Sequence, residues 1–114
     1  MNIRRGEVFL ATLDPVVGRE IAKTRPVVVV SNDKNNEFSG TVTILPIAST
    51  NVEKTYPFEV FFRRGTGNLP KDSKAKADQI RTLDKRRLVR KMGRLAEKEN
   101  SQINEAMRIH LGLE

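Results

Sequence analysis

Arg25 is the residue whose surroundings best suit chemistry, because it lies where a polar loop runs into a strand. The tripeptide Lys23-Thr24-Arg25 is followed by Pro26 and four valines. Proline fixes its own φ angle and favours an extended conformation in the residue before it, so the backbone of Arg25 has few alternatives. A guanidinium held in this way can bind two oxygens of one phosphate group. Arg25 is therefore a candidate phosphate ligand, and an ordinary surface arginine beside a strand is the alternative.

Hydroxyl and carboxylate side chains supply the other groups that phosphate chemistry needs. Ser49 and Thr50 follow a predicted strand, where each hydroxyl could bind a phosphate or simply cap a turn. Asp78 lies between basic neighbours that favour its charged form, so it could act as an acid or base or form a structural ion pair. Glu20, in a glycine-containing loop, is a second carboxylate. Such residues can cleave RNA without a metal by letting the ribose 2′-OH attack the adjacent phosphate. The sequence leaves open which of the two carboxylates is the base.

Composition excludes several other kinds of catalytic site. His110 is the only histidine, so two histidines cannot share acid and base roles within one chain, and its place in a predicted helix favours a packing or surface role. The chain has no cysteine, hence no disulfide, thiolate metal site or thiol nucleophile. It also has no H-E-x-x-H motif, no calcium-binding loop and no phosphate-binding G-x-x-x-x-G-K-[ST] loop. We therefore expect no cofactor and no metal ion.

The positive charge is concentrated in one part of the chain. The net charge is +7, and residues 63–94 contain twelve Lys or Arg against three Asp, a local net charge of +9. These charges alternate with residues typical of strands, which favours a basic face. A polyanion is the natural partner of such a face, because each phosphate that it neutralises releases condensed counterions. A solvated charged surface is the alternative.

Strand patterns dominate the first two thirds of the chain and a helix pattern dominates its end. Alternation and β-branched runs, bounded by turn residues, predict strands over residues 7–13, 27–31, 41–46, 58–62, 73–83 and 89–95. Residues 32–36 are rich in Asn and Asp, which predicts a turn. Asp84 can cap a short helical turn over residues 85–88. Residues 97–111 have helical spacing of apolar side chains, and Gly112 is positioned to end that helix.

Several short strands and one terminal helix predict an α+β fold built on a strongly twisted, partly closed antiparallel sheet. At 114 residues the chain can form one modest core, so we expect a single domain over residues 1–114. The apolar run at residues 8–11 is too short for a signal sequence or a membrane span. We therefore expect a cytoplasmic protein that does not associate with membranes.

Five segments together form a specific pattern. They are residues 5–8 (RGEV), 13–20 (LDPVVGRE), 24–32 (TRPVVVVSN), 56–60 (YPFEV) and 77–84 (ADQIRTLD). With this pattern, nearly the whole chain resembles the MazF/PemK toxins of bacterial type II toxin–antitoxin systems. The resemblance implies the SH3-like barrel of the CcdB/PemK-type plasmid maintenance toxins, with a C-terminal helix.

The same resemblance implies a function and partners. The implied activity is a sequence-selective, ribosome-independent endoribonuclease, which cuts single-stranded mRNA to leave a 2′,3′-cyclic phosphate and a 5′-hydroxyl. The implied assembly is a homodimer that a small acidic antitoxin holds inactive. Two alternatives stay open: a CcdB-like toxin that binds DNA gyrase without catalysis, and an RNA-binding module that has lost cleavage.

The resemblance also carries over catalytic residues. Arg25 matches the catalytic arginine of the family. Ala48 stands where family members usually have a catalytic threonine or serine, so the adjacent Ser49 is the candidate replacement. Asp78 matches an aspartate of the PemK-like members, whereas Lys76 stands in place of their arginine and can bind a phosphate only through single hydrogen bonds. Arg25, Ser49 and Asp78 are thus the predicted catalytic residues.

The loop around Gly18 would line an RNA groove across the dimer interface and contact the bases around the cut. The residues predicted to contact RNA are Gly18, Arg19, Glu20, Lys23, Thr24, Thr50, Lys76, Gln79 and Arg81. Recognition of single-stranded RNA usually includes stacking on aromatic rings, but this chain has five Phe, one Tyr and no Trp. We therefore expect charge and hydrogen bonds to supply more of the binding than stacking does.

Overall fold

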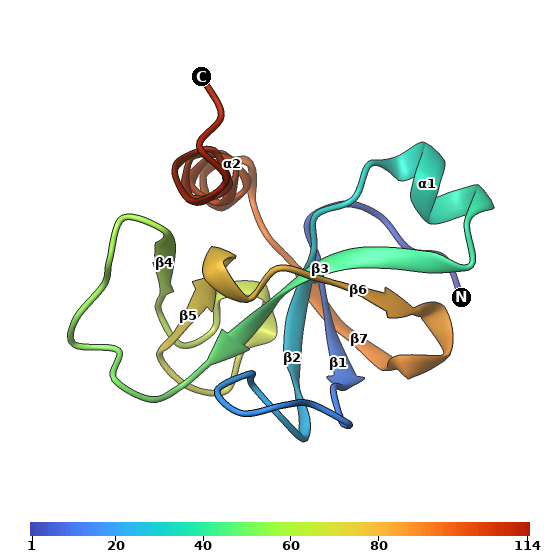
Figure 1. Ribbon diagram of the computed structural model, residues 1–114, viewed down its shortest axis with the longest axis horizontal. Coiled ribbons are helices and arrows are strands. Elements are labelled where there is room, and N and C mark those ends of the chain that lie inside the picture. Colours follow the sequence, from blue (N-terminus) through green and yellow to red (C-terminus); the bar gives the residue numbers. More distant parts are fainter.

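Seven antiparallel strands form the body of the protein, which a computed structural model describes over residues 1–114 (Figure 1). The strands are β1 (Glu7–Thr12), β2 (Thr24–Val29), β3 (Thr41–Ala48), β4 (Glu59–Phe62), β5 (Ser73–Lys76), β6 (Arg81–Asp84) and β7 (Leu88–Arg94). Their order in the sheet is β4-β5-β3-β2-β1-β7, and β6 pairs with β3 outside this path. The sheet does not close on itself. The predicted α+β fold built on an antiparallel sheet is confirmed.

Two helices accompany the sheet. α1 (Asp33–Phe38) connects β2 to β3, and α2 (Glu97–Leu111) lies over the β4 and β5 side of the sheet (Figure 1). Single 3-10 turns are formed by η1 (Thr66–Asn68), η2 (Ala77–Gln79) and η3 (Lys85–Arg87). The predicted C-terminal helix is confirmed, and Gly112 ends it with a left-handed φ of 69°. Neither helix is long and apolar enough to span a membrane.

Strand β3 joins the two halves of the sheet. Its first residues, Thr41 to Ile44, pair with β6, whereas Ile47 and Ala48 pair with β5. On its other side, β3 pairs with β2 from Ile44 to Pro46. The C-terminal end of β3 therefore lies between β5 and the start of β2. The residues that follow Ala48 begin at this point.

The core consists of two apolar clusters on opposite faces of the central strands. One cluster includes Val28, Phe62 and Ile103, and the other includes Val27 and Val29. Because successive side chains of a strand point to opposite faces, the valine run of β2 contributes to both clusters. This double burial agrees with the continuous β-branched run in the sequence.

The strand predicted over residues 73–83 is wrong, because these residues form two strands separated by η2. β5 pairs with β4, whereas β6 pairs with the first half of β3. One straight strand could not reach both partners. The chain turns where the N–H of Ala77 binds the carbonyl of Phe58 and the N–H of Ile80 binds that of Ala77.

The turn predicted over residues 32–36 is also wrong, because the short helix α1 begins there. The Asn32 side chain accepts a hydrogen bond from the N–H of Asn35 and thereby caps the helix. Asn36 is buried, and its side chain binds the carbonyl oxygen of Ser31. The asparagines thus serve as a cap and a buried anchor.

Three ends of strands β2 and β3 differ from the prediction by two or three residues. β2 begins at Thr24, and Arg25 lies inside the strand opposite Ala11 of β1. β2 ends at Val29, because the N–H groups of Val30 and Ser31 both bind the carbonyl of Thr43 and the regular ladder stops there. At its far end, β3 continues two residues beyond the predicted boundary at residue 46, because β5 pairs with these residues.

Candidate functional site

Two cavities open beside the C-terminal end of β3. We call the first the arginine cavity; its volume is about 160 Å³, and it is lined by Arg25, Pro26, Ile47, Ser49, Pro70, Lys71 and Ser73. We call the second the aspartate cavity; its volume is about 230 Å³, and it is lined by Arg19, Ile21, Ala48, Thr50, Asn51, Lys74, Lys76, Asp78 and Gln79. The consecutive residues Ala48, Ser49 and Thr50 therefore divide between the two cavities.

The arginine cavity brings Arg25 and Ser49 together. Arg25 is half-buried, and its Nε donates one hydrogen bond to the carbonyl oxygen of Ala22 at 3.2 Å. No carboxylate pairs with its guanidinium, so its charge is not neutralised within the chain. A guanidinium in this state can stabilise negative charge on a phosphate. Lys71, which the sequence analysis did not select, lines the same cavity.

The aspartate cavity brings together five of the predicted site residues. Asp78, Lys76, Thr50, Gln79 and Arg19 all line it. The Nζ of Lys76 lies 4.0 Å from the Oδ1 of Asp78 and 2.5 Å from the Oε2 of Glu59. The cavity therefore contains a carboxylate and an ammonium group that could take part in proton transfer and phosphate binding.

Glu59 is a buried carboxylate that sequence reasoning missed. Its Oε1 accepts hydrogen bonds from the Nζ of Lys74 at 3.0 Å and from the N–H of Tyr56 at 3.1 Å. Burial alone would raise the pKa of Glu59, but the hydrogen bonds from Lys76, the Tyr56 backbone and Lys74 lower it overall. Glu59 faces Lys76 across the β4–β5 ladder, and it holds that lysine beside the aspartate cavity.

A sequence signal for this pair does exist. Glu59 is a charged residue inside the apolar stretch of residues 58–62, and Lys74 occupies an inward position of β5. Both residues are about 5% exposed. Charged residues are almost never fully buried unless they are paired, so Glu59 within an apolar stretch signals a charged partner, but only the structure identifies that partner as Lys74.

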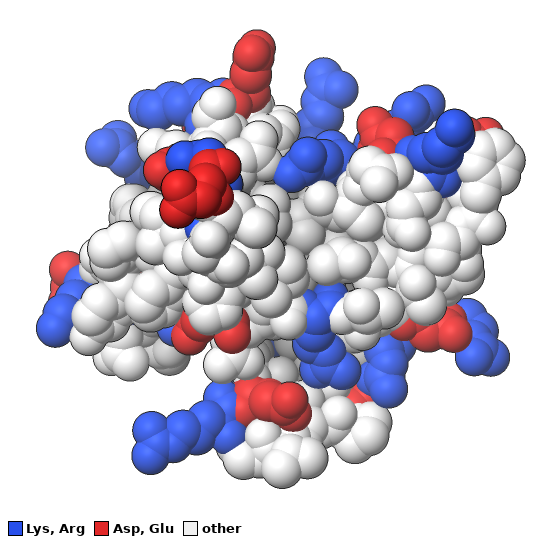
Figure 2. Space-filling model, turned by 45° about the horizontal axis from the view of Figure 1, so that its top comes forward, with Lys and Arg blue, Asp and Glu red and all other residues white.

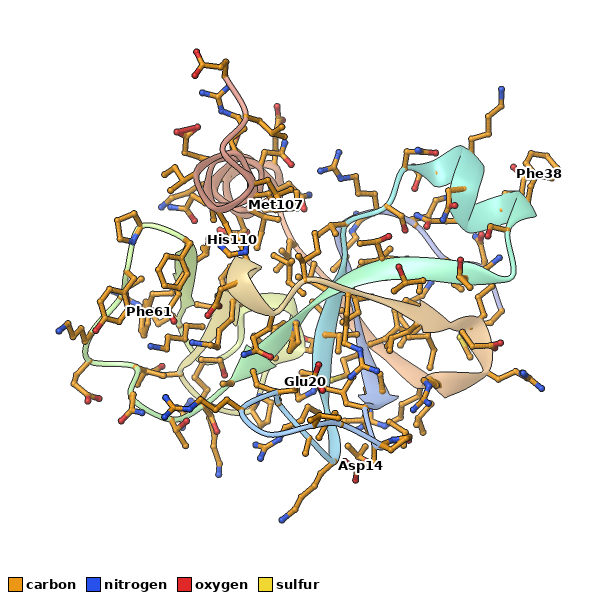
Figure 3. All side chains as sticks on the ribbon, in the orientation of Figure 1. Asp14, Glu20, Phe38, Phe61, Met107 and His110 are labelled. Carbon is orange, nitrogen blue, oxygen red and sulfur yellow. The ribbon has the colours of Figure 1, made fainter.

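The loop of residues 13–23 is held by its own side chains and by Gln79. The carboxylate of Glu20 accepts a hydrogen bond from the N–H of Val17 at 2.6 Å, and that of Asp14 accepts one from the N–H of Lys23 at 2.9 Å. Figure 3 shows Asp14 and Glu20 on this loop, beside the ends of β1 and β2. The Gln79 amide binds the N–H of Ile21 and the carbonyl of Arg19, so the loop is fastened against η2.

The remaining predicted RNA contacts line neither cavity. They are Gly18, Glu20, Lys23, Thr24 and Arg81. Arg81 donates a hydrogen bond to the carbonyl of Leu13 at 3.1 Å and so anchors the start of the loop. Gly18 has a left-handed φ of 58°, which suits a glycine in the turn that Glu20 closes.

The single histidine lies away from both cavities. His110 is on α2, and its ring centre lies 6.0 Å from that of Phe58, in a tilted arrangement. Figure 3 shows His110 and Met107 on the same helix. No group of three or more His, Cys, Asp or Glu side chains is arranged to hold a metal ion.

Folding gives the cations of the basic run of residues 63–94 different roles, and the basic face stays a prediction. Several of its cations bind oxygen atoms inside the chain: Lys74, Lys76, Arg81, Lys85 and Arg87. Arg86 pairs with Asp84, and its hydrogen bonds lower the pKa of that carboxyl to about 2. Figure 2 shows Lys and Arg spread around one face, several of them beside acidic side chains. Folding thus divides the run between internal anchors and separate surface groups.

Comparison with known proteins decides the family. Residues 4–111 match the family described as "PemK-like, MazF-like toxin of type II toxin-antitoxin system". The chain belongs to this family. This PemK/MazF toxin is 42% identical over 116 residues to "Endoribonuclease MazF9" of Mycobacterium tuberculosis, a match that covers 97% of the chain and 98% of the relative. It is 41% identical over 111 residues to "Endoribonuclease MazF" of Staphylococcus saprophyticus, with 97% and 92% covered.

Solved structures of similar proteins share the fold of this PemK/MazF toxin. The crystal structure of MazF from Deinococcus radiodurans has a TM-score of 0.84 and 25% sequence identity, with 98% of each chain covered. An endoribonuclease from a Mycobacterial species, solved in complex with its cognate antitoxin, has a TM-score of 0.81 and 26% identity, with 98% of this chain and 97% of that chain covered. The family resemblance predicted from the sequence is confirmed.

Proposed function

We propose that this endoribonuclease toxin cleaves single-stranded mRNA at selected sequences, without a metal ion and without the ribosome. The products would be a 2′,3′-cyclic phosphate and a 5′-hydroxyl. The observation that carries the proposal is the shared cavity of Arg25 and Ser49, which lies beside the cavity of Asp78 and Lys76 at the end of β3. The relatives named endoribonucleases support the same reaction class.

The proposed reaction needs a base, an acid and donors for the charge on phosphorus. The 2′-oxygen attacks the adjacent phosphorus and gives up its proton to the base. Arg25 and Ser49 stabilise the negative charge of the pentavalent intermediate through hydrogen bonds. The bond from phosphorus to the 5′-oxygen then breaks, and that oxygen takes a proton from the acid. The proposed reaction needs no oxidant, metal or further reactant.

Asp78 is the carboxylate that best suits the base. Its side chain lines the aspartate cavity, where the Nζ of Lys76 lies 4.0 Å from its Oδ1, and no hydrogen bond within the chain occupies its carboxylate. Glu20, the other candidate, already accepts a hydrogen bond from the N–H of Val17 within its own loop. Ser49 would supply the hydroxyl that Ala48 lacks.

We further propose that the protein is a single domain that works as a cytoplasmic homodimer and is inhibited by a small acidic antitoxin. Its membership of a toxin–antitoxin family supports this, as does the relative solved with its cognate antitoxin. Size-exclusion chromatography with light scattering should give twice the chain mass of 12.9 kDa. A monomer at micromolar concentration would contradict the dimer.

Cleavage of single-stranded RNA in excess EDTA tests the chemistry. We expect cutting at a recurring short motif, with 5′ ends that accept a phosphate from a kinase directly and 3′ ends that need acid to open a cyclic phosphate. Arg25→Ala protein, purified identically, controls for contaminating ribonucleases and should cut about 10²–10³-fold more slowly. Loss of cutting in EDTA would contradict the mechanism, and RNA binding without cleavage would support the binding-module alternative.

A further inference from the structure

A third cavity lies beside the arginine cavity. Its volume is about 630 Å³, and it is lined by Ser49, Val52, Arg63, Arg64, Pro70, Lys71 and Asp72. We call it the basic groove. Three of its residues, Ser49, Pro70 and Lys71, also line the arginine cavity, so the two cavities adjoin.

The cations of the basic groove are exposed and have no acidic partner. Arg63 and Arg64 follow β4, and Lys71 precedes β5. None of the three forms an ion pair in the structure, in contrast to Lys74, Lys76 and Arg86 of the same basic run. The groove therefore concentrates charge that folding leaves uncompensated.

The connection between β4 and β5 fixes the position of these cations. The N–H of Gly65 binds the carbonyl of Leu69 at 2.8 Å, which folds the connection back on itself. The Asp72 carboxylate accepts a hydrogen bond from the N–H of Arg64 at 2.8 Å. Asp72 is the one acid that lines the groove, and this bond ties it to the backbone. The groove thus presents three cations against one carboxylate.

We propose that the basic groove binds the RNA backbone beside the phosphate that is cut, so that the strand passes from Arg25 and Ser49 over Lys71 to Arg63 and Arg64. This inference rests on the proposed function. No aromatic side chain lines the groove, so it would follow the phosphates without stacking the bases. An acidic peptide could bind the same charges, but the three lining residues shared with the arginine cavity favour RNA.

The test measures binding of an unstructured 12-nucleotide RNA, between 50 and 200 mM salt, to Arg25→Ala protein, which should cut it about 10²–10³-fold more slowly than the wild type. Combining Arg63→Gln, Arg64→Gln and Lys71→Gln should make the plot of log affinity against log salt shallower by about two, at about 0.7 for each lost phosphate contact. Lys34→Gln, Arg90→Gln and Arg108→Gln remove the same charge from exposed positions outside the three cavities and should change the slope much less. Arg63→Lys, Arg64→Lys and Lys71→Arg together should keep the original slope.

The outcomes separate this inference from the proposed function. Equal salt slopes in the groove variant and the control variant would show that the basic groove does not bind the RNA backbone, even if the wild-type protein cuts RNA. If only the groove variant shows a shallower salt slope, and the wild-type protein never cuts RNA, the result would support RNA binding in the groove and contradict the proposed nuclease activity. If the groove variant keeps its RNA slope but loses affinity for poly-glutamate, the groove binds acidic peptides and the RNA inference is wrong.

Discussion

Arg25 and Lys76 lie on two sides of the end of β3, and the fold holds them in opposite ways. Arg25 makes one hydrogen bond to a neutral carbonyl group, whereas Lys76 lies 2.5 Å from the buried carboxylate of Glu59 and 4.0 Å from Asp78. The first cation is free to neutralise a bound phosphate. Lys76 already has two acidic partners, so it is better suited to orienting a neighbouring side chain. Two cations that look alike in the sequence are thereby suited to different tasks.

The largest effect should follow from removing the buried anion on the Lys76 side. Glu59→Gln leaves the ammonium of Lys74, about 5% exposed, without its charged partner. Breaking a buried ion pair in this way costs about 3–5 kcal/mol of unfolding free energy. Denaturation by urea measures the loss, and adding Lys74→Met to Glu59→Gln should recover much of it. A loss under about 1 kcal/mol would show that water already screens this pair.

The next largest effect should appear on the Arg25 side, in rate and not in stability. Removing one preorganised donor to a developing negative charge lowers turnover by about 10²–10³-fold. We expect this loss for Arg25→Ala in single-turnover cleavage, with an unchanged denaturation midpoint. Lys76→Ala should lower the rate less, because its charge is shared with Glu59 and Asp78. If Lys76→Ala proves the more damaging, the assigned roles are reversed.

A smaller effect should come from the hydroxyl in the arginine cavity. Ser49→Ala removes one hydrogen bond from a neutral hydroxyl to the charged phosphate, which corresponds to about a 10- to 150-fold fall in rate. Ala48→Thr, added to Ser49→Ala, restores a hydroxyl at the position that the family uses and should recover activity. An unchanged rate in Ser49→Ala would leave Arg25 as the only donor in that cavity.

The smallest effect should be a dependence of stability on pH that comes from Glu59. Its pKa is lower in the folded protein than its ordinary value of 4.5. The stability that this shift contributes is therefore complete above about pH 4.5 and disappears as the pH falls through the folded value. The difference in unfolding free energy between wild type and Glu59→Gln should accordingly shrink in acid. Asp84 contributes equally to both proteins, so its contribution cancels in this difference. A difference in unfolding free energy that stays constant down to pH 3 would contradict the prediction.

Local patterns predicted the elements whose limits are set locally. Strand β1, strand β4 and helix α2 follow from alternation, helical spacing and end signals such as Gly112. The division of residues 73–83 into two strands did not follow, because it depends on which distant strands β5 and β6 pair with. The start of β2 at Thr24 likewise depends on its partner β1.

The sequence by itself determined the family, the apolar strands and the kinds of side chain available for phosphate chemistry, since these follow from residue type and short-range spacing. Only the tertiary structure decided that Arg25 shares a cavity with Ser49, that Glu59 forms ion pairs with Lys74 and Lys76, and that three cations line one groove. The physical reason is that the charge and burial of a side chain depend on partners brought together by strand pairing, often far away in the chain.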